Sequence, residues 1–324
     1  MGTAESRPRP AGAWRRVPWR TVVCLIPLLG VGTWAVGHRP VIASGTRDLW
    51  AANRYWLLAA VAATALGWVA NAVARQGTVL EPLPPGRLLA TQFAATAASQ
   101  LAPAGVGAGA LNLRFLRVCG VPLGRTSAAI ALYSVCESVG RVTLLAVMLT
   151  AFPHALRLDG IAPGRTALVF MAAVAAAALC AVALVLVLVR PLRRIIREFL
   201  ATALTDVRAL HARPARALAL WGGSVAFPAL QAAAMVAVGR ALGLPVPSAH
   251  IALAYLAATV LAAGVPAPGG VGSVDAALAL ALVAAGAPTA TAASAVLAYR
   301  VISAWLPLLP AALVLAVLVR RKVV

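Results

Sequence analysis

The chain has 324 residues, of which 62% are hydrophobic and 11% are charged, and its mean hydropathy is +0.91. Because about a quarter of the residues in a soluble domain are charged, this composition excludes a water-soluble globular protein and predicts an all-α, polytopic membrane bundle. The net charge of +20 is the basic excess expected of cytoplasmic loops and tails. With no soluble basic domain to carry that charge, we expect no nucleic-acid partner.

Long apolar runs predict six spans in one transmembrane domain, residues 21–324, after a disordered basic tail at residues 1–20. The basic loops predict that the chain is a multi-pass protein of the cytoplasmic membrane, with both termini in the cytoplasm. Residues 191–211 predict an amphipathic helix on the anionic cytoplasmic leaflet, or alternatively a solvated helix packed on the bundle. The expected spans are residues 21–37, 55–74, 126–150, 166–189, 218–241 and 289–319, the last kinked at Pro307 and Pro310.

Two Pro- and Gly-rich stretches, residues 100–112 and 264–275, interrupt apolar regions of membrane length. The apolar segments beside them are shorter than the roughly 20 residues that cross a bilayer. Backbone groups freed at membrane depth must be satisfied by protein or by water in a cavity. We therefore predict two re-entrant helical hairpins, at residues 88–118 and 249–286.

The two breaks align as an internal repeat. Laying one on the other matches a proline and two glycines: Pro103 with Pro268, Gly105 with Gly270, and Gly107 with Gly272. The distribution of basic residues gives the two copies opposite orientations. Inverted repeats with broken helices that meet at the midplane are typical of transporters. A chance similarity between two Ala-rich hairpins is the alternative.

Charged residues lie inside expected spans, where lipid would surround them. Glu137 and Arg141 are four residues apart, acid first, which favours an ion pair on one helix face. Arg300 has no acid nearby in sequence, so it needs a distant partner, either Glu137 or Asp275. A charge near the bilayer centre costs about 2.5–3.5 kcal/mol on insertion scales, and such residues commonly mark functional sites. The alternative is an ion pair that only joins helices.

The second break also predicts the start of a helix. Ser273 and Asp275 follow a Gly-rich turn, where they favour an N-cap and a stabilising charge, with a proton acceptor as a further possibility for Asp275. Glycines permit close approach of a ligand, and two half-helix N-termini facing one cavity would attract a lipid phosphate. Close helix packing is the other use of such glycines. The four cysteines and four histidines lack metal-ligand spacing, so we expect no metal and no other cofactor.

Four stretches carry a resemblance to a known family. APAGVGAGALNLRFLRVCGVP, SVCESVGRV, GVPAPGGVGSVDAAL and AVLAYRVISAWLP resemble the lysylphosphatidylglycerol synthase transmembrane (flippase-like) family. The Pro-Gly-Gly-x-Gly-Ser block and the pair Tyr299-Arg300 are the most specific parts. The resemblance implies a membrane protein that moves or handles charged lipids, here a stand-alone member without the aminoacyl-transferase domain.

These features predict a translocator of a charged phospholipid or polyprenyl-linked lipid, with no catalytic residues and anionic lipid headgroups as its partners. The alternative is a membrane-embedded partner or enzyme in lipid-linked glycan or aminoacyl-phospholipid synthesis. We expect Arg141 and Arg300 to hold a phosphate, and Glu137 and Asp275 to balance a cationic group or carry a proton. The full set of candidate binding residues is Pro103, Gly105, Gly107, Asn112, Glu137, Arg141, Pro268, Gly269, Gly270, Gly272, Ser273, Asp275, Tyr299 and Arg300.

Overall fold

The computed structural model describes residues 52–101, 106–152, 208–262 and 273–320, and every regular element in these ranges is a helix. Within these ranges, four helical stretches are long and apolar enough to cross a membrane. They are α3 (Arg54–Gln76), α6 (Leu123–Ala151), α9 (Pro214–Ala241) and the continuous stretch Thr289–Arg320. This confirms an all-α membrane protein. The predicted segments at residues 1–20, 21–37 and 166–189, and most of 191–211, lie outside the described residues.

Short helices flank both predicted breaks. In the first half α4 (Pro85–Leu101) is followed by α5 (Val106–Val118), and in the second half α10 (Ser248–Ala262) is followed by α11 (Ser273–Ala284). Within each pair the two helices pack against each other. Re-entry of these pairs into the membrane from opposite sides stays a prediction.

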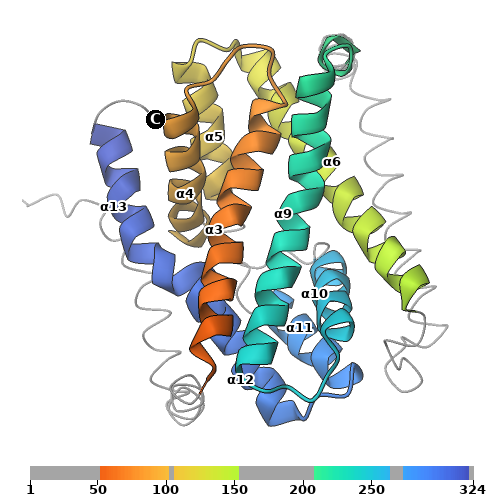
Figure 1. Cartoon of the computed structure of the whole chain (residues 1–324). Coiled ribbons are helices and arrows are strands. Elements are labelled where there is room, and N and C mark those ends of the chain that lie inside the picture. Colours follow the sequence, from red (N-terminus) through yellow and green to blue (C-terminus); the bar gives the residue numbers. More distant parts are fainter. Residues whose placement is uncertain (1–51, 102–105, 153–207, 263–272, 321–324) are drawn as a thin grey trace, which may run out of the picture. The chain divides into compact units, whose positions relative to one another are not determined.

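Helices α3 and α9 run side by side through the bundle (Figure 1) and form its most extensive helix–helix contact. Small residues allow this approach: a Cβ atom built on Gly223 would lie 2.6 Å from the carbonyl oxygen of Ala70 and 2.6 Å from the backbone nitrogen of Ala74. A Cβ on Gly77 would likewise overlap the backbone nitrogen of Leu220. Glycine at such positions brings two backbones together, which is the usual way for membrane helices to pack closely.

Arg216, near the start of α9, forms hydrogen bonds with the end of α3 and the segment that follows it. Its guanidinium donates hydrogen bonds to the carbonyl oxygens of Gln76, at 2.8 Å, and Leu80, at 3.2 Å. Carbonyls at the end of a helix have no partner within the helix. The arginine therefore satisfies partly buried backbone acceptors while it holds the segment after α3 against α9.

The last long stretch is built from α12 (Thr289–Arg300), a π-helical turn (Val301–Trp305, labelled η3) and α13 (Leu306–Arg320). The kink expected at Pro307 and Pro310 stays a prediction, and the π-helical turn lies just before the first of these prolines. Proline lacks an N–H group and its ring crowds the carbonyl four residues earlier, which for Pro307 is that of Ser303. Widening the preceding turn relieves this crowding, and such turns frequently occur at functional sites.

Candidate functional site

A partly open cavity of about 690 Å³ lies among the middle parts of the long helices and the broken ends of the short ones. It is bordered by the end of α4 at Gln100, the middle of α6 at Glu137, α9 at Gln231, the end of α10 at Thr259, the start of α11 at Asp275, and the α12–η3 junction at Arg300. Residues from both breaks therefore line the same space.

The first ion pair in this cavity lies on α6. Arg141 donates to Glu137 across 2.6 Å, and the two side chains are 18% and 22% exposed respectively. The spacing of four residues places both on one helix face, as predicted. Because the pair sits at the middle of a membrane-length helix and is not fully covered, its charged groups are available to a polar ligand.

The second ion pair joins two helices. Nε of Arg300 donates to Oδ1 of Asp275 across 2.5 Å, and the side chains are 14% and 23% exposed respectively. Asp275 lies in the first turn of α11, where a carboxylate is stabilised by the N-terminus of the helix. Of the two partners predicted for Arg300, Asp275 is the one that the geometry supplies.

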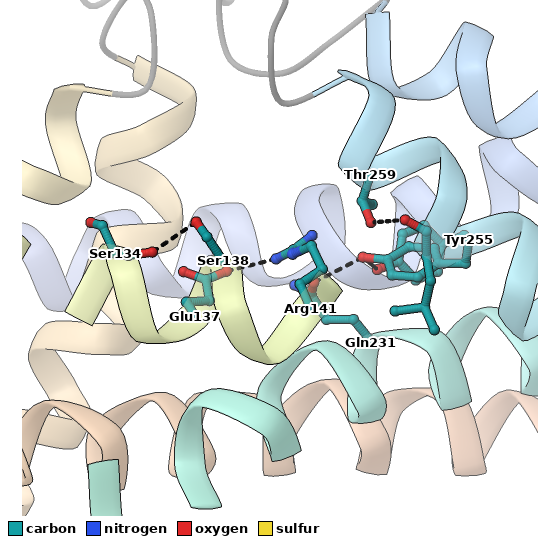
Figure 2. A network of polar contacts seen from close by, with 9 residues as sticks. Ser134, Glu137, Ser138, Arg141, Gln231, Tyr255 and Thr259 are labelled. Carbon is teal, nitrogen blue, oxygen red and sulfur yellow. Dashed lines mark hydrogen bonds and ion pairs between the residues drawn. The ribbon is translucent and has the colours of Figure 1, made fainter. Parts of the chain in front are cut away.

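Tyrosine hydroxyl groups form hydrogen bonds along the cavity wall beside the two ion pairs. The hydroxyl of Tyr299 donates to that of Tyr255 at 3.1 Å, and Tyr255 donates to Oε1 of Gln231 at 2.8 Å. The two rings meet edge to face with centroids 5.5 Å apart. In Figure 2, Arg141 lies between its partner Glu137 and the Tyr255–Gln231 contact. Hydrogen bonds thus join α9, α10 and α12, and α6 borders the same cavity beside them.

We expect Tyr255→Phe to destabilise the protein by about 1–3 kcal/mol, because it removes the partner of both Tyr299 and Gln231 in a buried setting. Unfolding of the purified protein in mixed detergent micelles would measure the change. Tyr55→Phe is the matched control, since Tyr55 is 79% exposed and should tolerate the same loss of a hydroxyl. Equal stability of the two variants would contradict the importance of this line of hydroxyl groups.

The structure brings five of the predicted residues to the cavity wall: Glu137, Arg141, Asp275, Tyr299 and Arg300. Gly107 and Asn112 lie elsewhere. Asn112 is buried, accepts a hydrogen bond from Gln92 at 2.8 Å and donates to the carbonyl of Ala108 at 2.7 Å, so it links α4 to α5. Pro103, Gly105, Pro268, Gly269, Gly270 and Gly272, and the side chain of Ser273, lie outside the described residues.

Several polar residues of the cavity wall were not among the predicted site residues. Gln231 and Tyr255 each stand in an otherwise apolar helical stretch, and Gln100 and Thr259 occur near the ends of the short helices. An uncharged polar side chain within a membrane-length apolar run is a usable signal, because it needs a hydrogen-bond partner there. A tyrosine is a weaker signal of a buried polar site, because tyrosine is also common at membrane interfaces.

The fold and the cavity define a class: a helical membrane protein with two ion pairs on a cavity that the ends of short helices also border. Comparison with known families gives a more specific assignment. The chain belongs to the lysylphosphatidylglycerol synthase transmembrane-region family, whose sequence profile matches residues 23–311. This makes it a membrane protein of lipid metabolism or transport that interacts with lipids. A search of curated proteins found no match.

Proposed function

We propose that the protein is a lipid translocator of the cytoplasmic membrane. In this proposal the headgroup of a charged phospholipid or polyprenyl-linked lipid passes through the cavity while its hydrocarbon tails stay in the bilayer. The observation that carries the proposal is that residues from both broken helix pairs, Gln100 and Thr259 among them, border one cavity with two ion pairs. Broken helices that meet around a charged site are the pattern of substrate sites in transporters.

The charges suggest a division of roles. Arg141 and Arg300 would bind the phosphate of the headgroup, and the first turn of α11 adds a helix N-terminus that favours an anion. Glu137 and Asp275 hold the two arginines in place when no headgroup is bound. When the phosphate of the headgroup takes the place of a carboxylate beside an arginine, the arginine stays paired with an anion. No isolated charge is then buried in the interior.

Reconstitution into liposomes tests the proposal. Fluorescent phospholipids in the outer leaflet are quenched by an impermeant reductant, and protein that moves lipid makes the inner-leaflet pool accessible as well. We expect Glu137→Ala and Arg300→Ala each to slow this movement about tenfold or more, equivalent to at least about 1.4 kcal/mol in the barrier.

Arg240→Gln is the matched control. Arg240 lies near the end of α9 and donates to the hydroxyl of Ser248 at 2.9 Å, away from the cavity wall. The control variant should move lipid at the wild-type rate. Size-exclusion profiles in detergent separate loss of function from loss of folding. Equal rates for wild type, Glu137→Ala and Arg300→Ala would remove these residues from the mechanism.

A further inference from the structure

Arg75 of α3 is a cation without a carboxylate partner among the described residues. Its Nε is buried and has no hydrogen-bond partner there. The guanidinium lies instead over the ring of Tyr133 on α6, 4.1 Å from the ring centroid, and Tyr133 is itself buried. A cation inside a membrane bundle is costly unless an anion compensates it, so the position of Arg75 requires a physical reason.

Glu137 links Arg75 to the cavity. Tyr133 and Glu137 are one helical turn apart on α6, and Glu137 is close enough to interact electrostatically with Arg75. The hydrogen bond of Glu137 goes to Arg141, at 2.6 Å. Glu137 and Arg141 line the cavity, whereas Arg75 is not among its described lining residues. Two guanidinium groups therefore act on one carboxylate, one from the cavity wall and one from behind it.

The charges in and beside the cavity do not cancel. Among the described residues there are three guanidinium groups, those of Arg75, Arg141 and Arg300. They act on two carboxylates, those of Glu137 and Asp275. The parts of the two breaks that lie outside the described ranges add no charge, because residues 102–105 and 263–272 contain no ionisable side chain. One positive charge therefore remains in excess.

We propose that Arg75 determines the charge specificity of the site, which selects a lipid headgroup with a single net negative charge: a phosphodiester whose remainder is uncharged. The proposal rests on the proposed function and names its class of lipid. When the phosphodiester binds Arg141, Arg75 still compensates Glu137, and the total charge becomes zero. Arg75 does not touch the headgroup, so it acts through Glu137 as a specificity-determining residue.

Other headgroups leave net charge in the bundle. A zwitterionic headgroup, with a phosphate and an ammonium group, keeps the excess positive charge. A cationic group, which the sequence predicts as a ligand of Glu137 and Asp275, increases it. A dianionic phosphomonoester replaces it with a negative charge. Net charge is expensive inside a membrane protein, so each of these headgroups is disfavoured relative to the phosphodiester anion.

The uncharged part of the cavity wall suits hydroxyl groups. Six uncharged amide and hydroxyl side chains without an aromatic ring line it: Gln100, Ser134, Ser138, Gln231, Thr259 and Ser303. The hydroxyls of Ser134, Ser138 and Thr259 already donate to carbonyls of their own helices, so their oxygens can accept hydrogen bonds from a ligand. A polyol supplies such donors. The remainder of the headgroup is therefore the glycerol of a phospholipid or a sugar on a polyprenyl phosphate.

Liposome transport of two lipids tests the charge specificity. Phosphatidylglycerol and phosphatidylethanolamine, each with the fluorophore on an acyl chain, share their tails and differ in the net charge of the headgroup. We expect the wild type to move the phosphatidylglycerol analogue at least about tenfold faster. Equal rates for the two lipids would overturn the proposal.

Two substitutions cancel the excess charge by different routes. Arg75→Gln removes the cation behind the wall, and Gln231→Glu adds an anion on the wall with almost the same shape. Each should lower the ratio of the two transport rates by about tenfold. Arg75→Lys keeps the charge and should keep the ratio. A merely structural role of Arg75 would slow both lipids equally, so the ratio distinguishes the two roles.

Arg240→Gln is the matched control, because it removes one cation from outside the cavity wall. It should retain the wild-type ratio. A loss of preference in this variant would trace the preference to the general basic charge of the protein, which is +20, and would overturn the role of the site.

Competition distinguishes the two sources of the polyol. An unlabelled polyprenyl phosphate hexose is added in excess to liposomes that contain the fluorescent phosphatidylglycerol. Slower movement of the fluorescent lipid supports a site that accepts a sugar, and unchanged movement overturns the sugar as a ligand and leaves glycerol.

Binding in detergent separates this proposal from the proposed function, because it needs no transport. Fluorescent phosphatidylglycerol on the purified full chain is displaced by unlabelled phosphatidylglycerol or phosphatidylethanolamine. A binding preference that is lost in Arg75→Gln, without lipid movement in liposomes, supports the specificity and overturns the translocator. Lipid movement without any charge preference does the reverse.

The two variants also decide the role of Arg75. A ratio that falls in Gln231→Glu and not in Arg75→Gln assigns the specificity to the wall alone and overturns the role of Arg75. An unchanged ratio in both variants overturns the excess charge as its cause. Should Arg75→Gln fail to fold, Arg75→Lys and Gln231→Glu still test the charge, since the first must keep the preference and the second must lose it.

Discussion

Arg300→Ala should lower the free energy of unfolding by about 3 kcal/mol, because it leaves the carboxylate of Asp275 in a mostly buried place without its arginine partner. The side chains are 14% and 23% exposed, so solvent screens the pair only in part. Titration of the protein in mixed micelles with a denaturing detergent would measure the loss. Removing one partner of such a pair costs more than the pair itself contributes, because an uncompensated charge stays behind.

Two controls make this prediction specific. Reversal of the pair, Arg300→Asp with Asp275→Arg, should recover part of the lost stability, because opposite charges again face each other while the N-terminus of α11 disfavours an arginine at position 275. Arg320→Ala removes an exposed cation at the end of α13 and should change stability by less than about 0.5 kcal/mol. A stability loss for Arg300→Ala no larger than that for Arg320→Ala would show that the pair with Asp275 has no structural role.

Gly223→Ala should destabilise the protein by about 1–3 kcal/mol, since the new methyl group would press on the backbone of α3 at Ala70 and Ala74. Backbone atoms cannot rotate away as a flexible side chain can. Helices α3 and α9 must therefore move apart to make room for the methyl group. The midpoint of thermal unfolding in detergent should fall accordingly.

Gly222→Ala is a matched control one residue earlier in the same helix. A Cβ atom at Gly222 would meet no atom within 4 Å, and alanine favours a helix over glycine by up to about 1 kcal/mol. This variant should therefore be as stable as the wild type or slightly more stable. Equal destabilisation by both substitutions would contradict the close α3–α9 contact.

The sequence predicts local features of the site better than distant ones. The pair Glu137–Arg141 follows from a spacing of four residues on one helix and is confirmed. The partner of Arg300 stayed open between two acids, because 25 residues and a change of helix separate it from Asp275. The class of fold followed from composition and the length of apolar runs, whereas which helices pack together depends on contacts that no single stretch encodes.

Asn112 shows why nearness in sequence misleads. We included it in the binding set because it closes the first Pro/Gly-rich stretch. Its position on α5 instead directs the amide to Gln92, twenty residues away on α4, and to a carbonyl of its own helix. One residue in a helix turns by about 100°, so a neighbour of a break need not face the same side as the break.

The glycine contacts at the crossing of α3, α6 and α9 have a mechanical consequence. Gly77, Gly140 and Gly223 place backbone directly against backbone, and such contacts have no side-chain rotamers that could absorb sliding. We therefore expect these three helices to stay fixed relative to one another. In the proposed translocation cycle we expect the displacement where α10, α11 and the π-helical turn after Arg300 border the cavity.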